Sequence, residues 1–151
     1  MTVRRWLAST PRRSFVLYPV CIVLIELLLR RGALVIDPLG LPLLIWGYAQ
    51  YRWSGLYRTQ HGGGGPGIDI PPTRIVDTGI YAYVRNPMYL GHLIFMIGLA
   101  VTFHSLAAVA LLAFHLWWFH QRVLEDETHM TGLFGDSFTD YTRRVRRWGI
   151  V

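Results

Sequence analysis

The chain has 151 residues, of which 52% are hydrophobic, and a formal net charge of +6, so a single domain is the simplest expectation. All 15 basic residues are arginines, and they alternate with apolar blocks instead of forming one basic face, which argues against a nucleic-acid-binding domain and is typical of a membrane protein. The lone Cys21 excludes an intrachain disulfide, and no His–Cys cluster has the spacing of a zinc site, so we expect no metal.

The first part of the chain predicts a surface segment and one membrane span. Residues 1–13 carry arginines around a tryptophan, and no small-residue cleavage site follows, which favours a cytoplasmic amphipathic segment over a signal peptide. The apolar run near residues 15–30 predicts the span, although it is short against the ~20 residues that a spanning helix needs. Glu26 is expected either beside Arg30 at the interface or facing a polar cavity.

A second span is predicted near residues 33–52, with a turn first and the helix proper beginning near Leu41. Its later half is rich in aromatic residues, as expected near an interface, although a cofactor-lining face is an alternative. A long polar connection is expected over residues 52–85. The glycine-rich run His61–Gly67 lacks the Gly-Lys-Ser/Thr ending and the preceding strand of a phosphate loop, so we interpret it as a flexible linker.

Two further spans are predicted near residues 88–103 and 106–123, and they form a helical hairpin. The turn between them is His104-Ser105, and Ser105 is suited to cap the helix that follows. That last helix is expected to continue into water and to stop at Gly132.

The tail over residues 134–151 alternates apolar and basic groups with helical spacing. Arginines fill one side, and the pattern predicts a basic amphipathic helix lying on an anionic membrane surface. The apolar side is formed by Phe138, Tyr141, Val145 and Trp148.

The expected fold is therefore all-α, a polytopic membrane protein with about four transmembrane helices. Most arginines lie before the first span, between the second and third, and after the fourth, which predicts that both termini face the cytoplasm. The all-arginine basic set and the short chain favour a bacterial source, and hence the bacterial inner membrane.

Residues 79–91 join the polar connection to the third apolar run. Pro87 suits the first turn of a helix, and Asn86 before it can cap the free amides there. A helix start readily receives an anionic group. An alternative interpretation is that the neighbouring polar side chains anchor this helix at the membrane surface. They are Tyr81, Tyr83, Arg85 and Tyr89.

The sequence Gly-Ile-Tyr-Ala-Tyr-Val-Arg-Asn-Pro-Met-Tyr-Leu-Gly of residues 79–91 resembles the signature of the isoprenylcysteine carboxyl methyltransferase family, which is related to the phospholipid N-methyltransferases. The lead-in at residues 71–76 is also similar to that family. The acidic block of residues 125–127, with the Phe-Gly pair and the tyrosine that follow it, resembles the family's C-terminal motif. The first sixty residues match only as apolar helices.

The resemblance implies an integral-membrane methyltransferase that uses S-adenosylmethionine at its cytoplasmic edge. Arg122 would orient the acceptor, and Glu127, with His129 as an alternative, would be a candidate base. Two departures, Asn86 where the family often has His and Asp126 where it usually has Glu, put the acceptor in doubt. The implied cofactor-binding residues are Thr73, Arg74, Ile75, Val76, Tyr81, Asn86, Pro87, Met88, Tyr89 and Asp126.

Helical spacing gives a second argument for a site on the last predicted span. One face of that helix carries His115, Arg122, Asp126 and His129. This polar face is expected to leave the membrane where the helix that follows the motif enters it. The alternative is a surface ion pair between Arg122 and Asp126, contributing less than ~1 kcal/mol.

Three functions are compatible with the sequence. The first is methyl transfer to a lipophilic acceptor, a small molecule or a lipidated chain, through a carboxylate of isoprenylcysteine type. The second is N-methylation of a phospholipid amine such as ethanolamine. The third is a non-enzymatic membrane scaffold, which the paired motifs disfavour. The expected partners are the bilayer and the acceptor, with neither nucleic acid nor metal.

Overall fold

A computed structural model describes residues 9–66, 68 and 70–149, and within these ranges it contains helices and no strand. The predicted all-α class is confirmed. The amphipathic segment predicted at the N-terminus lies mostly outside the described residues.

The chain forms two compact units, and neither is continuous in sequence. Unit 1 comprises Met1–Ala49 and Gly91–His115, and unit 2 comprises Gln50–Leu90 and Leu116–Val151. The chain passes between the units three times, at residues 49/50, 90/91 and 115/116, and each crossing falls inside a helix, α4, α5 and α6 in turn. A single domain, as the chain length predicts, stays a prediction.

Unit 1 begins with helical segments that follow one another without a gap: α2 (Thr10–Arg12), the π-helical turn η1 (Arg13–Leu17) and α3 (Tyr18–Leu29). They cover the first predicted span. Glu26 is buried on α3, and its Oε2 accepts a hydrogen bond of 2.8 Å from Nε of Arg30. The expectation that Glu26 lies beside Arg30 is confirmed.

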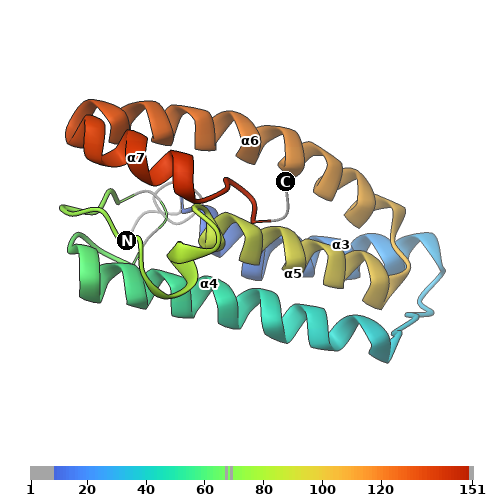
Figure 1. Ribbon diagram of the computed structural model, residues 1–151. Coiled ribbons are helices and arrows are strands. Elements are labelled where there is room, and N and C mark those ends of the chain that lie inside the picture. The colour runs from blue at the N-terminus through green and yellow to red at the C-terminus, as the bar shows by residue number, and fades with distance from the viewer. Residues whose placement is uncertain (1–8, 67, 69, 150–151) are drawn as a thin grey trace. The chain divides into compact units, whose positions relative to one another are not determined.

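The second long helix, α4 (Leu41–Gly62), begins at Leu41 as predicted and follows the short 3-10 helix η2 (Pro38–Gly40) (Figure 1). The helix continues past residue 52, where the predicted span ends, into the residues expected to form a polar connection. No proline lies between residues 52 and 62, and the first pair of adjacent glycines comes at Gly62-Gly63, so the helix extends to Gly62. The first part of the predicted polar connection is therefore helical.

Within unit 1, α4 packs closely against α5 (Pro87–Phe103), which starts at Pro87 as predicted. A Cβ atom added at Gly47 would lie 2.5 Å from the backbone nitrogen of Phe95 and 2.7 Å from the carbonyl oxygen of Gly91. The backbones can approach this closely because Gly47 has no side chain. An apolar cluster built on Ile22, Leu99 and Ala108 fills the neighbouring space.

The longest helix is α6 (Leu106–Phe134). Oγ of Ser105 accepts a hydrogen bond of 3.2 Å from the backbone nitrogen of Ala108, so the predicted cap is confirmed. The predicted stop at Gly132 is wrong, because Gly132 is helical. Gly135 ends the helix instead, with a left-handed φ of 54°.

The C-terminal helix α7 (Asp136–Arg144) is shorter than predicted, and Trp148 lies beyond it. The predicted placement of its apolar side on a membrane surface is wrong, because that side is covered by protein within unit 2. Phe138, Tyr141 and Val145 are buried against Ile75, Met130 and Phe134.

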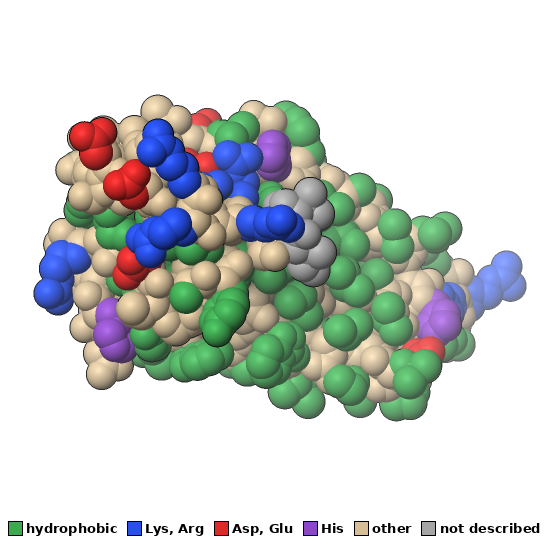
Figure 2. Space-filling view, in the orientation of Figure 1, with side chains coloured by type: hydrophobic (Ala, Val, Ile, Leu, Met, Phe, Trp, Pro, Cys, Tyr) green, Lys and Arg blue, Asp and Glu red, His purple; other side chains and the backbone are tan. Residues whose placement is uncertain are grey.

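The surface of unit 1 is largely apolar. Large hydrophobic side chains stand exposed on all its long helices, including Leu28, Ile45, Trp46 and Leu106. Figure 2 shows apolar side chains predominating where unit 1 is drawn, and acidic and basic groups gathered over α7 in unit 2. Among residues 9–149, apart from 67 and 69, no helix combines the length and the apolar character required to cross a membrane.

Candidate active site

A cavity of about 410 Å³ lies within unit 2 and collects most of the predicted site residues. Its wall is built from the end of α4, the loop that follows, the start of α5, the later part of α6, and α7. Ten of the twelve residues that the motifs predicted line this cavity. They are Ile75, Val76, Tyr81, Asn86, Pro87, Met88, Tyr89, Arg122, Asp126 and Glu127.

The other two predicted residues, Thr73 and Arg74, are not among the lining residues and hold the loop instead. The carbonyl oxygen of Gly62 accepts hydrogen bonds from the backbone nitrogens of Thr73 and Arg74, at 2.8 and 3.0 Å, and from Oγ1 of Thr73, at 2.9 Å. These bonds attach the lead-in segment to the end of α4.

Asp126 presents a carboxylate to the cavity. Its Oδ2 accepts a short hydrogen bond of 2.6 Å from the hydroxyl of Tyr89. Nε of Arg122 lies 3.7 Å from Oδ1, and both side chains are about 40% exposed, so this pair adds little stability. The ring of Tyr89 packs edge-on against Phe119, with the ring centroids 5.0 Å apart, which fixes the direction of the hydroxyl.

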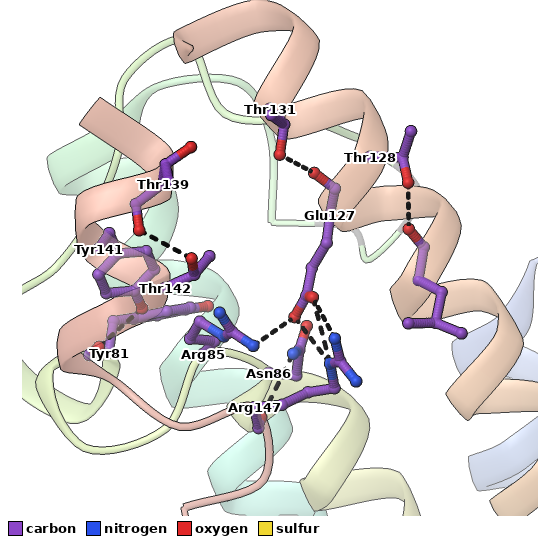
Figure 3. Close-up of polar contacts among 11 residues, drawn as sticks. Tyr81, Arg85, Asn86, Glu127, Thr128, Thr131, Thr139, Tyr141, Thr142 and Arg147 are labelled. Atoms are coloured by element: carbon purple, nitrogen blue, oxygen red, sulfur yellow. Dashed lines mark hydrogen bonds and ion pairs between the residues drawn. The ribbon is translucent and has the colours of Figure 1, made fainter. Parts of the chain in front are cut away.

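Glu127 is held between two arginines (Figure 3). Its Oε2 lies 2.7 Å from Nη2 of Arg147, Nε of Arg147 reaches both carboxylate oxygens at 3.1 Å, and Nη2 of Arg85 lies 3.1 Å from Oε1. The side chain of Arg85 is only 10% exposed, and burial lowers the pKa of its guanidinium while the charge of Glu127 opposes that effect. The prediction that Glu127 acts as a base stays a prediction.

Asn86 and Pro87 begin α5 and also make side-on contacts. The amide Nδ2 of Asn86 donates a hydrogen bond of 3.3 Å to the carbonyl oxygen of Arg147. The carbonyl oxygen of Pro87 accepts one of 3.1 Å from Nε2 of the buried Gln50. The motif is therefore tied both to α4 and to the C-terminal segment.

Two buried tyrosines link the motif to α7. The hydroxyl of Tyr141 donates a hydrogen bond of 2.7 Å to the carbonyl oxygen of Tyr81, and the hydroxyl of Tyr81 donates one of 3.2 Å to the carbonyl oxygen of Ser54. Burial raises the pKa of both phenols well above its usual range, because the phenolate would lose its hydration. Both side chains stay neutral donors at neutral pH.

Comparison with known proteins decides the family. A family model described as phospholipid methyltransferase matches residues 39–137, which include the motif and the acidic block. The chain belongs to the phospholipid methyltransferase family. The resemblance that the motifs carry is thus confirmed.

The curated relatives of this family member include protein-S-isoprenylcysteine O-methyltransferases. The protein of Schizosaccharomyces pombe is 36% identical over 72 residues, which are 47% of this chain and 30% of the relative. The mouse protein is 32% identical over 72 residues, 47% of this chain and 25% of the relative. The nickel-cobalt-cadmium resistance protein NccN of Alcaligenes xylosoxydans xylosoxydans is 31% identical over 73 residues, 48% of this chain and 34% of the relative. The matches thus span about a third or less of these relatives.

No solved structure matches the chain. Within the described ranges, the family member also contains no group of three or more His, Cys, Asp or Glu side chains placed to hold a metal ion.

Several residues of the cavity wall were not predicted. Arg58 lies on the unpredicted part of α4, and its Nη2 donates to the carbonyl oxygens of Gly65 and Ile70, at 3.3 and 2.8 Å, so it closes the glycine-rich loop. Met130 and Phe138 line the cavity from α6 and α7. Met130 and Phe138 carried only the signal of apolar helical spacing, which a packed core shares.

One member of the predicted polar face of α6 lies elsewhere. Arg122, Asp126 and His129 line the cavity, but His115 belongs to unit 1, where it is buried and its Nε2 lies 3.3 Å from the hydroxyl of Tyr18. Helical spacing placed the four on one face, but the helix is long enough for that face to meet different neighbours along its length.

The cavity offers both apolar and charged groups to a small-molecule ligand. Apolar and aromatic side chains, including Ile75, Val76 and Met88, offer a surface for a purine ring. The partly exposed carboxylate of Asp126 is suited to ribose hydroxyls or an ammonium group. The volume of about 410 Å³ lies within the range of small-molecule sites, about 300–1,000 Å³.

Proposed function

We propose that this chain is an integral-membrane methyltransferase that takes its methyl group from S-adenosylmethionine and transfers it to a lipophilic carboxylate of isoprenylcysteine type. The observation that carries the proposal is the convergence of ten motif residues, distant in sequence, on one cavity. A non-enzymatic scaffold would not require the partly exposed Asp126 and Arg122 to meet the motif there.

The roles of the chain's residues follow from their contacts. S-adenosylmethionine supplies an activated methyl group on its sulfonium, so the protein has mainly to bind, align and exclude water. Asp126, oriented by Tyr89, binds the polar part of the donor. Arg122, whose Nε lies 3.7 Å from Oδ1 of Asp126 at the cavity wall, orients the acceptor carboxylate bidentately.

A carboxylate acceptor also agrees with the state of the candidate bases. A carboxylate is already a nucleophile at neutral pH, whereas an amine must first lose a proton. Glu127 is paired with two arginines, which occupy both of its oxygens. This arrangement is better suited to an acceptor that needs no base.

The membrane placement is part of the proposal, with four spans near residues 15–30, 33–52, 88–103 and 106–123. It is supported by the exposed apolar side chains of unit 1 and by the scarcity of charge in these stretches. The lipophilic acceptor would reach the site from the bilayer, and the soluble donor from the cytoplasm.

The test is methyl transfer by the purified protein in detergent or in vesicles. Membranes are incubated with protein and S-adenosylmethionine, and mass spectrometry follows acceptors that gain the mass of one CH2 group. Calorimetry measures binding of the donor and of its demethylated product without added metal. Folded protein that binds neither compound would support the scaffold interpretation instead.

A second candidate function is N-methylation of a phospholipid amine. The description of the matching family model favours it, and His129 in the cavity wall offers a base. The same assay separates the two candidates: a prenylated cysteine with a free carboxylate and phosphatidylethanolamine are supplied in turn, and only one of them should be methylated.

A further inference from the structure

The segment that follows α7, residues 145–149, is attached to the motif and to Glu127 of α6 by contacts that all lie within unit 2. The backbone nitrogen of Arg85 donates a hydrogen bond of 3.0 Å to the carbonyl oxygen of Arg146. Nδ2 of Asn86 donates to the carbonyl oxygen of Arg147, and the guanidinium of Arg147 grips Glu127 with both Nε and Nη2 (Figure 3). At the far end, a Cβ atom added at Gly149 would lie 3.4 Å from Cβ of Val84 and 3.6 Å from the carbonyl oxygen of Tyr83, so Gly149 is close to both residues.

The motif residues in these contacts are themselves part of the cavity wall. Arg85, Asn86 and Glu127 all line the cavity, and Arg85 and Glu127 also line a second, more polar groove on which Arg147 lies. Arg85 and Glu127 thus form a wall that the cavity and the groove share. Loss of the contact with Arg147 would leave this shared wall without its support.

We propose that Glu127 is a positioning residue, which fixes the C-terminal segment through Arg147 and thereby holds Arg85 and Asn86 in the donor-binding wall. The inference rests on the proposed function for the identity of the donor, but the attachment of the segment does not. Its contribution is to donor affinity and not to proton transfer.

The geometry separates this role from that of a base. Both oxygens of Glu127 accept charged hydrogen bonds, and its side chain is 15% exposed. A general base needs a carboxylate oxygen directed at the acceptor. Attachment of the C-terminal segment needs a bidentate ion pair, which an arginine and a carboxylate provide. Arg147 is the other partner of this ion pair, so its loss should lower donor affinity as much as the loss of Glu127.

The experiment compares Glu127→Gln, Arg147→Gln and the double variant with Arg143→Gln as a matched control. Arg143 is an exposed arginine of α7 whose contact is an ion pair of 3.4 Å with Asp140. Each variant is tested for binding of S-adenosylmethionine by calorimetry, for kcat and the KM for the donor, and for trypsin cleavage after Arg146.

We expect each single variant to weaken donor binding about tenfold, a usual size for coupling between two sites. The double variant should be no weaker than the poorer single variant, because both remove the same contact. The loss should fall on the KM for the donor more than on kcat. Cleavage after Arg146 should be faster in Glu127→Gln, and Arg143→Gln should behave as the unchanged protein.

Other results would overturn the inference. Loss of kcat in Glu127→Gln, with normal donor affinity and a protected tail, would make Glu127 a base. The proposal would also be contradicted if the losses of donor affinity in the two single variants added up in the double variant, or if Arg143→Gln lost as much affinity. If Glu127→Gln does not fold, Arg147→Gln decides through donor affinity. If the unchanged protein binds no donor, the proposed function fails, and cleavage after Arg146 alone decides whether Glu127 holds the segment.

Discussion

At the scale of single residues, Asp126 and Arg122 lie one helical turn apart and face the same cavity with different neighbours. The carboxylate of Asp126 accepts a hydrogen bond of 2.6 Å from the hydroxyl of Tyr89, whereas Nε of Arg122 lies 3.7 Å from Oδ1 of Asp126. A donor-binding carboxylate and an acceptor-orienting arginine would differ in what their loss affects.

We therefore expect Asp126→Ala to weaken binding of S-adenosylmethionine about tenfold or more, because a charged hydrogen bond contributes ~1.5–3 kcal/mol. Arg122→Ala should leave donor affinity nearly unchanged and lower turnover, through loss of acceptor alignment. Calorimetric titration and turnover assays on the two variants measure both quantities. Equal and small effects would instead indicate a surface ion pair, and would remove this part of α6 from the active site.

The buried tyrosines predict how stability depends on pH. The pKa of Tyr141 is raised in the folded protein, so the unfolded chain loses its phenolic proton first, near its ordinary value of about 10. The stabilising effect is present below that pH and is lost as the pH rises toward the folded value. We expect the melting temperature to fall above about pH 10, and to fall less in Tyr141→Phe. A variant that loses stability as steeply as the unchanged protein would exclude Tyr141 as the cause.

At the scale of elements, the approach of α4 to α5 in unit 1 depends on Gly47. A Cβ atom there would meet the backbone of Phe95 at 2.5 Å, and backbone cannot move aside as a flexible side chain can. We expect Gly47→Ala to destabilise the protein by about 1–3 kcal/mol, the usual cost of overpacking. Thermal unfolding in detergent measures the change.

Gly132 provides the matched control for that substitution. It lies inside α6, and a Cβ atom added there would meet nothing within 4 Å. Gly132→Ala should therefore stabilise the protein by about 0.5–1 kcal/mol, since alanine loses less backbone entropy in a helix. Destabilisation by both substitutions to the same degree would show that close packing at Gly47 is not the reason.

The same helices show how far the sequence predicts the fold. The starts of α4, α5 and α6 were predicted at or within one residue, because a proline, a turn or a serine cap marks each of them. The ends of these helices were not predicted. Helix α4 continues to the adjacent glycines Gly62 and Gly63, and α6 continues through Gly132, where an added Cβ atom would meet nothing within 4 Å. A glycine permits a left-handed turn without requiring one.

The site divides in the same way. The residues within short motifs were predicted, since their spacing carries the signal, and most of them line the cavity. Arg58 and Phe138 were not predicted. Their place in the cavity wall depends on how α4 and α7 pack within unit 2, and a local sequence pattern does not determine that packing. The sequence predicts that the apolar side of α7 lies on a membrane surface. Helical periodicity shows that an apolar face is covered, but it does not show whether lipid or protein covers it.

At the scale of the whole molecule, the distribution of arginine makes a prediction about topology. Positive charge predominates before the first predicted span and after the fourth, which predicts that both ends of this chain face the cytoplasm. Reporter fusions at residue 1 and residue 151 should both give a cytoplasmic signal in cells. One external signal would mean that the number of spans is odd and that the four-span arrangement is wrong.

The attachment of α7 and the segment after it to the motif has a consequence for biosynthesis. Phe138 and Tyr141 are translated after every other residue of the cavity wall, and the contacts of Arg146 and Arg147 with the motif come later still. A nascent chain that has emerged only as far as α6 carries the motif and the acidic block but no finished wall. If the cavity binds the donor as proposed, a nascent chain becomes competent to bind it only once it has been translated through Arg147.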